Sequence, residues 1–277
     1  MYAMGRRLSL VNEIPLYLEI QSGFEDDYFR RTYGLNTFSI TGCEISRPRS
    51  SELMRLARIA TNQILPFLQR GYYSNFTSNF DRRYLDMKVV RPIYLDGYWQ
   101  DERYFSDIRV ELKNDLTFIQ QHNEMTENLA REMRSSESVA VHVRQLHGVP
   151  AGSEKPNASI ESLPNEYYRS AVQSIKERRR DPKFYLFSDS TSLISIPALT
   201  EENVTRVDSG GADAQYEDLY LMSQCRHFVL ANSTYSWWGT WLGRTSESII
   251  VSPVMREWNQ YVQLPGEWHS IEWARRP

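Results

Sequence analysis

Apolar runs alternate with a helical pattern in the second half of the chain. The runs, each of a length that suits one strand, lie at residues 138–143, 184–187, 227–230 and 249–251. Between the first two runs, residues 165–180 place apolar side chains on one side of a helix, at Tyr168, Ala171, Val172 and Ile175. Parallel strands need a crossover connection and helices are the usual crossover. The alternation therefore predicts a parallel sheet covered on both faces.

The first half has a less regular pattern. Residues 52–69 and 110–133 each space apolar side chains for one face of a helix. Between them, residues 89–99 predict a strand that ends in a turn at Gly97. Residues 1–8 have the pattern of a helix interior with no cap before it. The first half therefore predicts a second α/β unit.

A polar break, Arg-Ser-Ser-Glu at residues 134–137, separates the two halves. We expect a domain boundary there, because a chain of 277 residues is long enough for two ordinary domains. The predicted domains are an N-terminal α/β half over residues 1–134 and a C-terminal α/β half over residues 135–277.

Composition excludes several classes of protein. Apolar residues make up 41% and charged residues 24% of the chain, as in soluble globular domains. The formal charge of −3 gives no electrostatic footprint for nucleic acid, so we expect no nucleic-acid partner. Cys43 and Cys225 lie far apart in segments that read as interior, which argues against a disulfide framework. The sequence has no apolar stretch of about 20 residues and no signal peptide, so we expect a cytoplasmic protein.

In parallel sheets of this type, ligands bind beyond the carboxyl ends of the strands. The first such end carries His142 and Arg144, which are two residues apart on one strand and point to the same face. An arginine there can make a bidentate, permanently charged contact with a diphosphate. Taken alone, the pair can equally be an ordinary structural or surface pair.

Two further strand ends carry polar groups. Asp189 follows the run at 184–187, where it can cap a helix or accept hydrogen bonds from a guanine ring edge. Residues 231–236 can present backbone N–H groups and side-chain polar groups to phosphate oxygens at a helix N-terminus, through Asn232, Ser233, Thr234 and Ser236. Three indoles follow within five positions and suit a buried helix face, at Trp237, Trp238 and Trp241.

Three segments resemble one family. Residues 231–238, Ala-Asn-Ser-Thr-Tyr-Ser-Trp-Trp, are similar to the N-S-[ST]-[FY]-S-W-W segment of the α-1,2-fucosyltransferases, glycosyltransferase family 11. Gly-Tyr-Trp-Gln at residues 97–100, followed by Tyr104 and Phe105, resembles another signature of that family. Tyr-Gly-Leu at residues 33–35, with Phe38 and Ile40, is similar to an early family element.

The resemblance implies a GT-B-type glycosyltransferase with two Rossmann-like halves, of which the C-terminal half holds the GDP-sugar. It implies an inverting galactoside 2-alpha-L-fucosyltransferase that moves L-fucose from GDP-β-L-fucose to the 2-hydroxyl of a galactoside. It also implies that the enzyme needs no metal and no cofactor. The expected partners are GDP-fucose and a galactose-containing glycan, with possible peripheral association with the inner face of the membrane through a lipid-linked acceptor.

The same resemblance assigns roles to individual residues. Arg144 would hold the pyrophosphate and stabilise the charge of the leaving group in place of a metal. The other donor-binding residues would be His142 and Asp189 near the guanine, and Asn232, Ser233, Thr234 and Ser236 near the phosphates. On the acceptor side the resemblance points to Tyr98, Trp99 and Gln100. An inverting transfer also needs a base, for which the sequence leaves open Glu19, Asp96, Asp101 and His147.

Two departures from the family pattern keep other interpretations open. The family motif H-x-R-R-x-D lacks its second Arg and its Asp here, where the chain reads His142-Val143-Arg144-Gln145-Leu146-His147. Relatives also begin with a strand and a G-G-L-G-N-Q loop that this sequence lacks, so we expect an N-terminal half that is truncated or has a misassigned start. The alternatives are a catalytically impaired GDP-sugar-binding relative and a transferase for another GDP-sugar.

Overall fold

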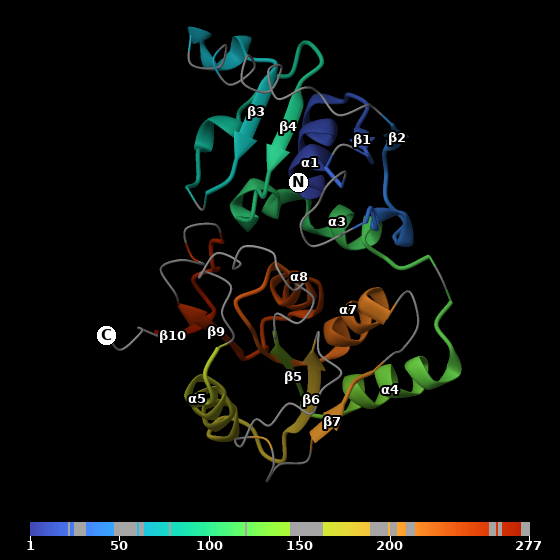
Figure 1. The fold of residues 1–277 in the computed structure, drawn as a ribbon, viewed down its shortest axis with the longest axis vertical. Helices are drawn as coiled ribbons and strands as arrows, with labels where there is room; N and C mark the ends of the chain where they lie inside the picture. The colour runs from blue at the N-terminus through green and yellow to red at the C-terminus, as the bar shows by residue number, and fades with distance from the viewer. Residues whose placement is uncertain are drawn as a thin grey trace, which may run out of the picture. The chain divides into compact units, whose positions relative to one another are not determined.

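The chain divides into two compact units, Met1–Ile119 with Gln260–Gln263, and Gln120–Asn259 with Leu264–Pro277 (Figure 1). The structure is a computed structural model that describes residues 1–21, 23–24, 32–46, 60, 64–77, 79–119, 121–144, 163–188, 199, 204–208, 214–254, 259 and 262–272. Both units contain parallel strands, which confirms the α/β class. No helix in these ranges is long and apolar enough to cross a membrane.

The second unit is built on a six-stranded parallel sheet of order β10-β9-β8-β5-β6-β7. Its strands are β5 (Ser138–Val143), β6 (Lys183–Ser188), β7 (Val204–Arg206), β8 (His227–Val229), β9 (Ile250–Val254) and β10 (His269–Glu272). The chain moves outward on one side from β5 to β7 and on the other side from β8 to β10. This is the doubly wound order, and its topological switch point lies between β5 and β8.

The helices of this unit are α4 (Glu124–Ser135), α5 (Asn165–Lys176), α7 (Ala214–Gln224) and α8 (Thr234–Gly243). The predicted stripe of α5 is buried in a hydrophobic core together with Val139, Val141 and Phe184 of the sheet. Strands β5, β6, β8 and β9 fall on the four predicted apolar runs, because strands buried on both faces need continuous apolar sequence.

Helix α4 shows why the units divide after residue 119 and not at the sequence break after residue 134. Glu127 accepts a hydrogen bond from the Tyr220 hydroxyl of α7 at 2.9 Å, and Glu132 accepts one from the Tyr185 hydroxyl of β6 at 2.9 Å. Ala130 and Met133 on the same helix are completely buried. Helix α4 is therefore part of the second unit, although its sequence reads as a continuation of the first.

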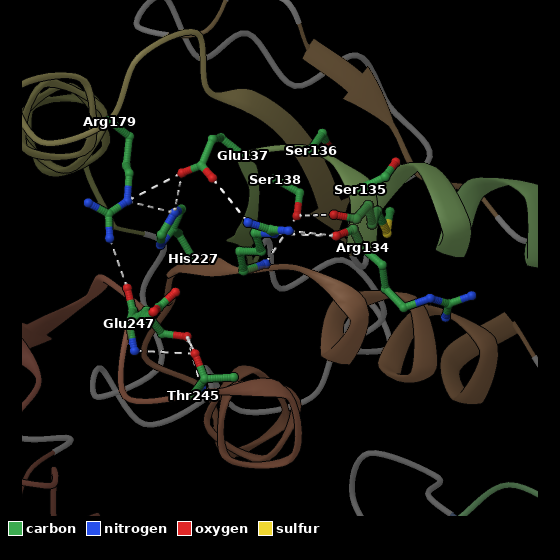
Figure 2. A network of polar contacts seen from close by, with 12 residues as sticks. Arg134, Ser135, Ser136, Glu137, Ser138, Arg179, His227, Thr245 and Glu247 are labelled. Atoms are coloured by element: carbon green, nitrogen blue, oxygen red, sulfur yellow. Dashed lines mark hydrogen bonds and ion pairs between the residues drawn. The ribbon is translucent and has the colours of Figure 1, made fainter.

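A network of charged groups joins the amino ends of β5 and β8 (Figure 2). The Glu137 carboxylate contacts Arg226 Nη1 at 3.2 Å, Arg179 Nε at 3.3 Å and His227 Nε2 at 3.1 Å. His227 Nδ1 accepts the backbone N–H of Ile249 at 3.0 Å, so the ring proton is on Nε2 and points to Glu137. Burial lowers the pKa of His227 from its ordinary value, and the hydrogen bond from His227 lowers the pKa of Glu137.

The first unit has short elements. They are α1 (Tyr2–Asn12), β1 (Tyr17–Glu19), β2 (Cys43–Ile45), β3 (Tyr72–Asn75), β4 (Tyr94–Gly97), α3 (Arg109–Asp115) and the 3-10 turns η1 (Leu35–Thr37), η2 (Phe67–Gln69), η3 (Arg82–Tyr84), η4 (Glu102–Tyr104) and η5 (Ser106–Ile108). Strand β1 pairs with β2, and β3 pairs with β4, both in parallel. Helix α1 is held by Arg6, which pairs with Asp115 at 2.7 Å, and by Arg7, which pairs with Asp107 at 2.8 Å.

Three predictions for the first half differ from the structure. Residues 110–133 form two helices and not one, because α3 ends at Asp115 and the Asn123 side chain caps a new helix by accepting the N–H of Thr126 at 2.9 Å. The strand expected over residues 89–99 is confined to β4. Cys43 is exposed, so the interior reading holds only for Cys225. Most of the helix expected over residues 52–69 lies outside the described residues.

Candidate functional site

Arg144 lies directly after β5, at the switch point of the six-stranded sheet. Strand β5 pairs with β6 on one side and with β8 on the other, and Val143 is in register with Ser188. The carboxyl ends of these three strands therefore meet at one edge, with β6 and β8 on opposite sides of β5. In doubly wound sheets, ligands bind beyond the carboxyl ends of the strands at the switch point.

Helix α8 begins at the same edge, at Thr234, five residues beyond the end of strand β8 at Val229. Its N-cap is Ser233, whose hydroxyl oxygen accepts the N–H of Tyr235 at 3.3 Å. Arg144 Nη1 donates a hydrogen bond to the same oxygen at 3.2 Å. A guanidinium and the positive end of a helix dipole are thus brought together, although 89 residues separate Arg144 from Ser233. Such an arrangement binds phosphate groups.

His142 is buried on β5, two residues before Arg144. Burial, together with the positive charge of Arg144, lowers the pKa of His142 to about 3. The imidazole is therefore neutral at physiological pH, and Arg144 provides the permanent positive charge. The Nδ1 atom of His142 is buried and has no hydrogen-bond partner among the described residues, so it is available to a ligand group or a water molecule.

The remaining phosphate-side residues differ in exposure. Asn232 and Ser236 are buried, whereas Thr234, the first residue of α8, is exposed. The Ser236 hydroxyl donates to the carbonyl of Ser233 at 3.1 Å and lies 3.4 Å from that of Ala231, so it supports the turn that begins the helix. The structure brings Arg144 and Ser233 into direct contact. Asp189 and His147 lie outside the described residues.

Tyr98, Trp99 and Gln100 follow strand β4 in the first unit and differ in exposure. Tyr98 is exposed, and Trp99 and Gln100 are buried. Three of the four residues considered as a base are described. Asp96 accepts the Gly97 N–H at 2.8 Å, and Glu19 accepts the Gln21 N–H at 2.8 Å. Asp101 is buried and pairs with Arg103 at 2.5 Å. Each of these three carboxylates therefore has a local structural contact.

Two tyrosines support the site and were not predicted from the sequence. The Tyr235 ring lies 5.5 Å from that of His142, and its hydroxyl donates to the carbonyl of Gln215 at 2.6 Å. The Tyr168 hydroxyl of α5 donates to the carbonyl of His142 at 3.3 Å. Tyr235 lies within the Ser-Thr-Tyr-Ser segment, and this position could have identified it as a residue of the site. An aromatic residue at the start of an apolar helix is, however, typical of a packing role.

Trp237 and Trp241 of the indole cluster are completely buried. Trp238 lies edge-on to both, with ring centroids 5.0 Å from Trp237 and 5.4 Å from Trp241. Packing is therefore the role of Trp237 and Trp241, as the sequence predicted.

A doubly wound parallel sheet, with an arginine and a helix N-terminus at its switch point, defines a class of α/β domains that bind nucleotides or nucleotide sugars. The sequence pattern of Glycosyl transferase family 11 matches residues 40–274. The chain belongs to this glycosyltransferase family.

Two curated relatives come from Escherichia coli. The chain is 31% identical over 184 residues to an alpha-1,2-colitosyltransferase, in an alignment that covers 64% of this chain and 61% of that protein. It is 27% identical over 281 residues to the O-antigen biosynthesis glycosyltransferase WbnK, with 93% and 88% covered. The chain thus spans less than two thirds of the colitosyltransferase and most of WbnK.

Among solved structures, the chain is similar to the alpha-1,6-fucosyltransferase NodZ soaked with GDP-fucose, at 14% identity and a TM-score of 0.45, with 87% of this chain and 86% of NodZ covered. It is also similar to POFUT1 in complex with GDP, at 13% identity and a TM-score of 0.40, with 89% and 92% covered.

Proposed function

We propose that this glycosyltransferase moves L-fucose from GDP-β-L-fucose to the 2-hydroxyl of a galactoside, with inversion and without a metal or cofactor. The observation that carries the proposal is the contact between Arg144 and Ser233 at the N-terminus of α8. One fixed positive charge and a helix dipole at the same point support the binding of a diphosphate leaving group. The name of the alpha-1,2-colitosyltransferase supports the α-1,2 linkage.

The transfer is a single displacement. The acceptor hydroxyl oxygen attacks the anomeric carbon of fucose while the bond from that carbon to the β-phosphate oxygen breaks, so the β-linked donor gives an α-linked product. Negative charge collects on the departing GDP, where Arg144 and the N–H groups of α8 stabilise it. The acceptor proton passes to a base that we leave unassigned, because the remaining candidate from the sequence, His147, lies outside the described residues.

A second donor is favoured by a specific observation, the 31% identity to a colitosyltransferase. The diphosphate site at Arg144 would serve either donor, because its contacts are directed to the leaving group and not to the transferred sugar. Competition between GDP-fucose and GDP-colitose for the same acceptor distinguishes the two. The relative named for O-antigen biosynthesis supports a glycan acceptor, which we infer to be lipid-linked and presented at a membrane surface.

The proposal is tested by the Arg144→Ala and Arg144→Lys variants. Loss of the guanidinium should lower the rate of fucose transfer by roughly 100-fold or more, since removal of one donor to a developing oxyanion has an effect of that order. Lysine should restore only part of the rate, because it lacks the planar fork of arginine.

Arg180→Ala is the matched control, because Arg180 is exposed on the same unit. It should transfer fucose at the wild-type rate, and EDTA should leave the wild-type rate unchanged. Transfer by Arg144→Ala at more than half the wild-type rate would contradict the role of Arg144. GDP binding without transfer to any galactoside by the wild-type protein would instead support the impaired relative.

A further inference from the structure

Two exposed aromatic side chains stand side by side where strands β3 and β4 end. Asn75 is in register with Gly97 at the carboxyl ends of this parallel pair, and the next residues are Phe76 and Tyr98. Their side chains are 47% and 48% exposed, and their rings meet edge to face with centroids 5.9 Å apart and planes at 87°. The arrowheads of both strands lie at the same end of the pair in Figure 1. Parallel α/β units bind ligands at such ends.

The backbone beneath this pair is held in an unusual conformation. Gly97 has φ of 101°, and a Cβ atom there would lie 2.1 Å from the carbonyl oxygen of Asn75. The N–H of Tyr98 donates to that same carbonyl at 2.7 Å. Trp99 follows with φ of 53°, and its indole N–H donates to the carbonyl of Asp96 at 2.8 Å. Non-glycine residues with positive φ are uncommon and gather at ligand sites.

Two buried side-chain amides, those of Asn75 and Gln100, flank the two rings in sequence, and one atom of each has no partner among the described residues. Asn75 is 7% exposed and Gln100 is 4% exposed. Asn75 Oδ1 and Gln100 Nε2 have no hydrogen-bond partner in the described part of the chain. Asn75 Nδ2, in contrast, donates to the hydroxyl of Tyr104 at 3.1 Å. Buried polar atoms are rarely left unsatisfied, so the free acceptor of Asn75 and the free donor of Gln100 each indicate a polar ligand group or an ordered water.

We propose that Phe76 and Tyr98 form the platform on which the acceptor sugar packs, with hydroxyl groups of the glycan reaching the amides of Asn75 and Gln100. The inference rests on the proposed galactoside specificity and deepens it. The C–H groups on one face of galactose form an apolar patch, which a pair of exposed rings can cover, while hydroxyls at the rim of the sugar need hydrogen-bond partners. A substrate without sugar hydroxyls would leave the amides unsatisfied.

The test measures acceptor binding separately from transfer. Saturation-transfer NMR with lactose as the probe, and acceptor kinetics with GDP-fucose, are carried out on the wild type, Phe76→Ala, Tyr98→Ala and Tyr98→Phe. Each alanine variant should raise the lactose KM by about 10-fold, the loss of one aromatic contact, and weaken the lactose signal. Tyr98→Phe keeps the ring and should stay within about 3-fold of wild type.

Val90→Ala is the matched control, because Val90 is 87% exposed in the same unit and outside this pair. It should bind lactose as the wild type does, and all variants should bind GDP with unchanged affinity. If lactose binds the alanine variants as it binds the wild type, or binds none of the proteins, the platform is refuted. If lactose binds through the rings but no fucose is transferred to it, the proposed function fails and the platform stands.

Discussion

Helix α8 packs closely against α7, and two of its glycines should differ in how much a substitution destabilises the fold. A Cβ atom on Gly243 would lie 2.3 Å from the carbonyl oxygen of Ser223 and 2.9 Å from its Cα atom. Backbone atoms cannot rotate away, so Gly243→Ala forces the two helices apart. A Cβ atom on Gly239 would lie 2.5 Å from the sulfur of Met222, which is near the end of a flexible side chain.

The expected magnitudes follow from this difference. Overpacking against a rigid neighbour lowers the free energy of unfolding by about 1–3 kcal/mol. Replacing glycine by alanine within a helix raises it by up to about 1 kcal/mol. Gly243 is the last residue of α8, so it gains little from helix propensity. We therefore expect Gly243→Ala to lower the free energy of unfolding by about 2 kcal/mol. Gly239→Ala should stay within about 1 kcal/mol of wild type.

Urea unfolding followed by tryptophan fluorescence provides the measurement, because Trp237 and Trp241 are buried on α8. The midpoint should fall for Gly243→Ala and change little for Gly239→Ala. The displacement of α8 should also weaken GDP binding by Gly243→Ala, since Ser233 caps the same helix. Equal stability of Gly243→Ala and wild type, or a larger loss for Gly239→Ala, would refute this packing argument.

Two further predictions concern the N-cap and the charged network. Ser233→Ala should destabilise α8 by about 1 kcal/mol and also weaken GDP binding, as measured by calorimetry, because the hydroxyl both caps the helix and contacts Arg144. For His227, burial holds the folded-state pKa below 6.5, so its neutral form stabilises the fold above pH 6.5 and this contribution is lost as the pH falls through the folded-state value. His227→Gln should flatten the fall in the urea midpoint between pH 7 and 5, and an unchanged slope would count against the role of the ring. The urea midpoint of that variant should still fall somewhat with pH, because His142 is also buried and burial lowers its pKa.

The sequence predicted the central sheet of the second unit because its strands are buried on both faces. Continuous apolar runs identify such strands without help from the rest of the fold. Strands β7 and β10 lie at the two edges of the sheet and have no such run, as in Val-Thr-Arg and His-Ser-Ile-Glu. The strands of the first unit are three or four residues long and have mixed exposure, so tertiary pairing and not sequence pattern defines them.

The candidate site was predictable where a charged residue follows a clear strand. Arg144 and the Asn-Ser-Thr turn were both identified from the sequence, but their contact depends on strand order, which periodicity does not report. The pairing of Phe76 with Tyr98 was not predicted, because strand β3 has no recognisable pattern. Gly243 ends an apolar helix, and only the neighbouring backbone of Ser223 shows why a side chain is not tolerated there.

The pairing of β5 with β8 should couple nucleotide binding to the stability of the sheet. It joins Val139 to His227, whereas β5 and β6 join Ser138 to Lys183. The strand that leads to Ser233, the partner of Arg144, is therefore more distant in the chain than the other neighbour of β5. A diphosphate that touches both Arg144 and the start of α8 would cross-link the two halves of the sheet. Saturating GDP should therefore protect the amides of β5 and β8 together from hydrogen exchange.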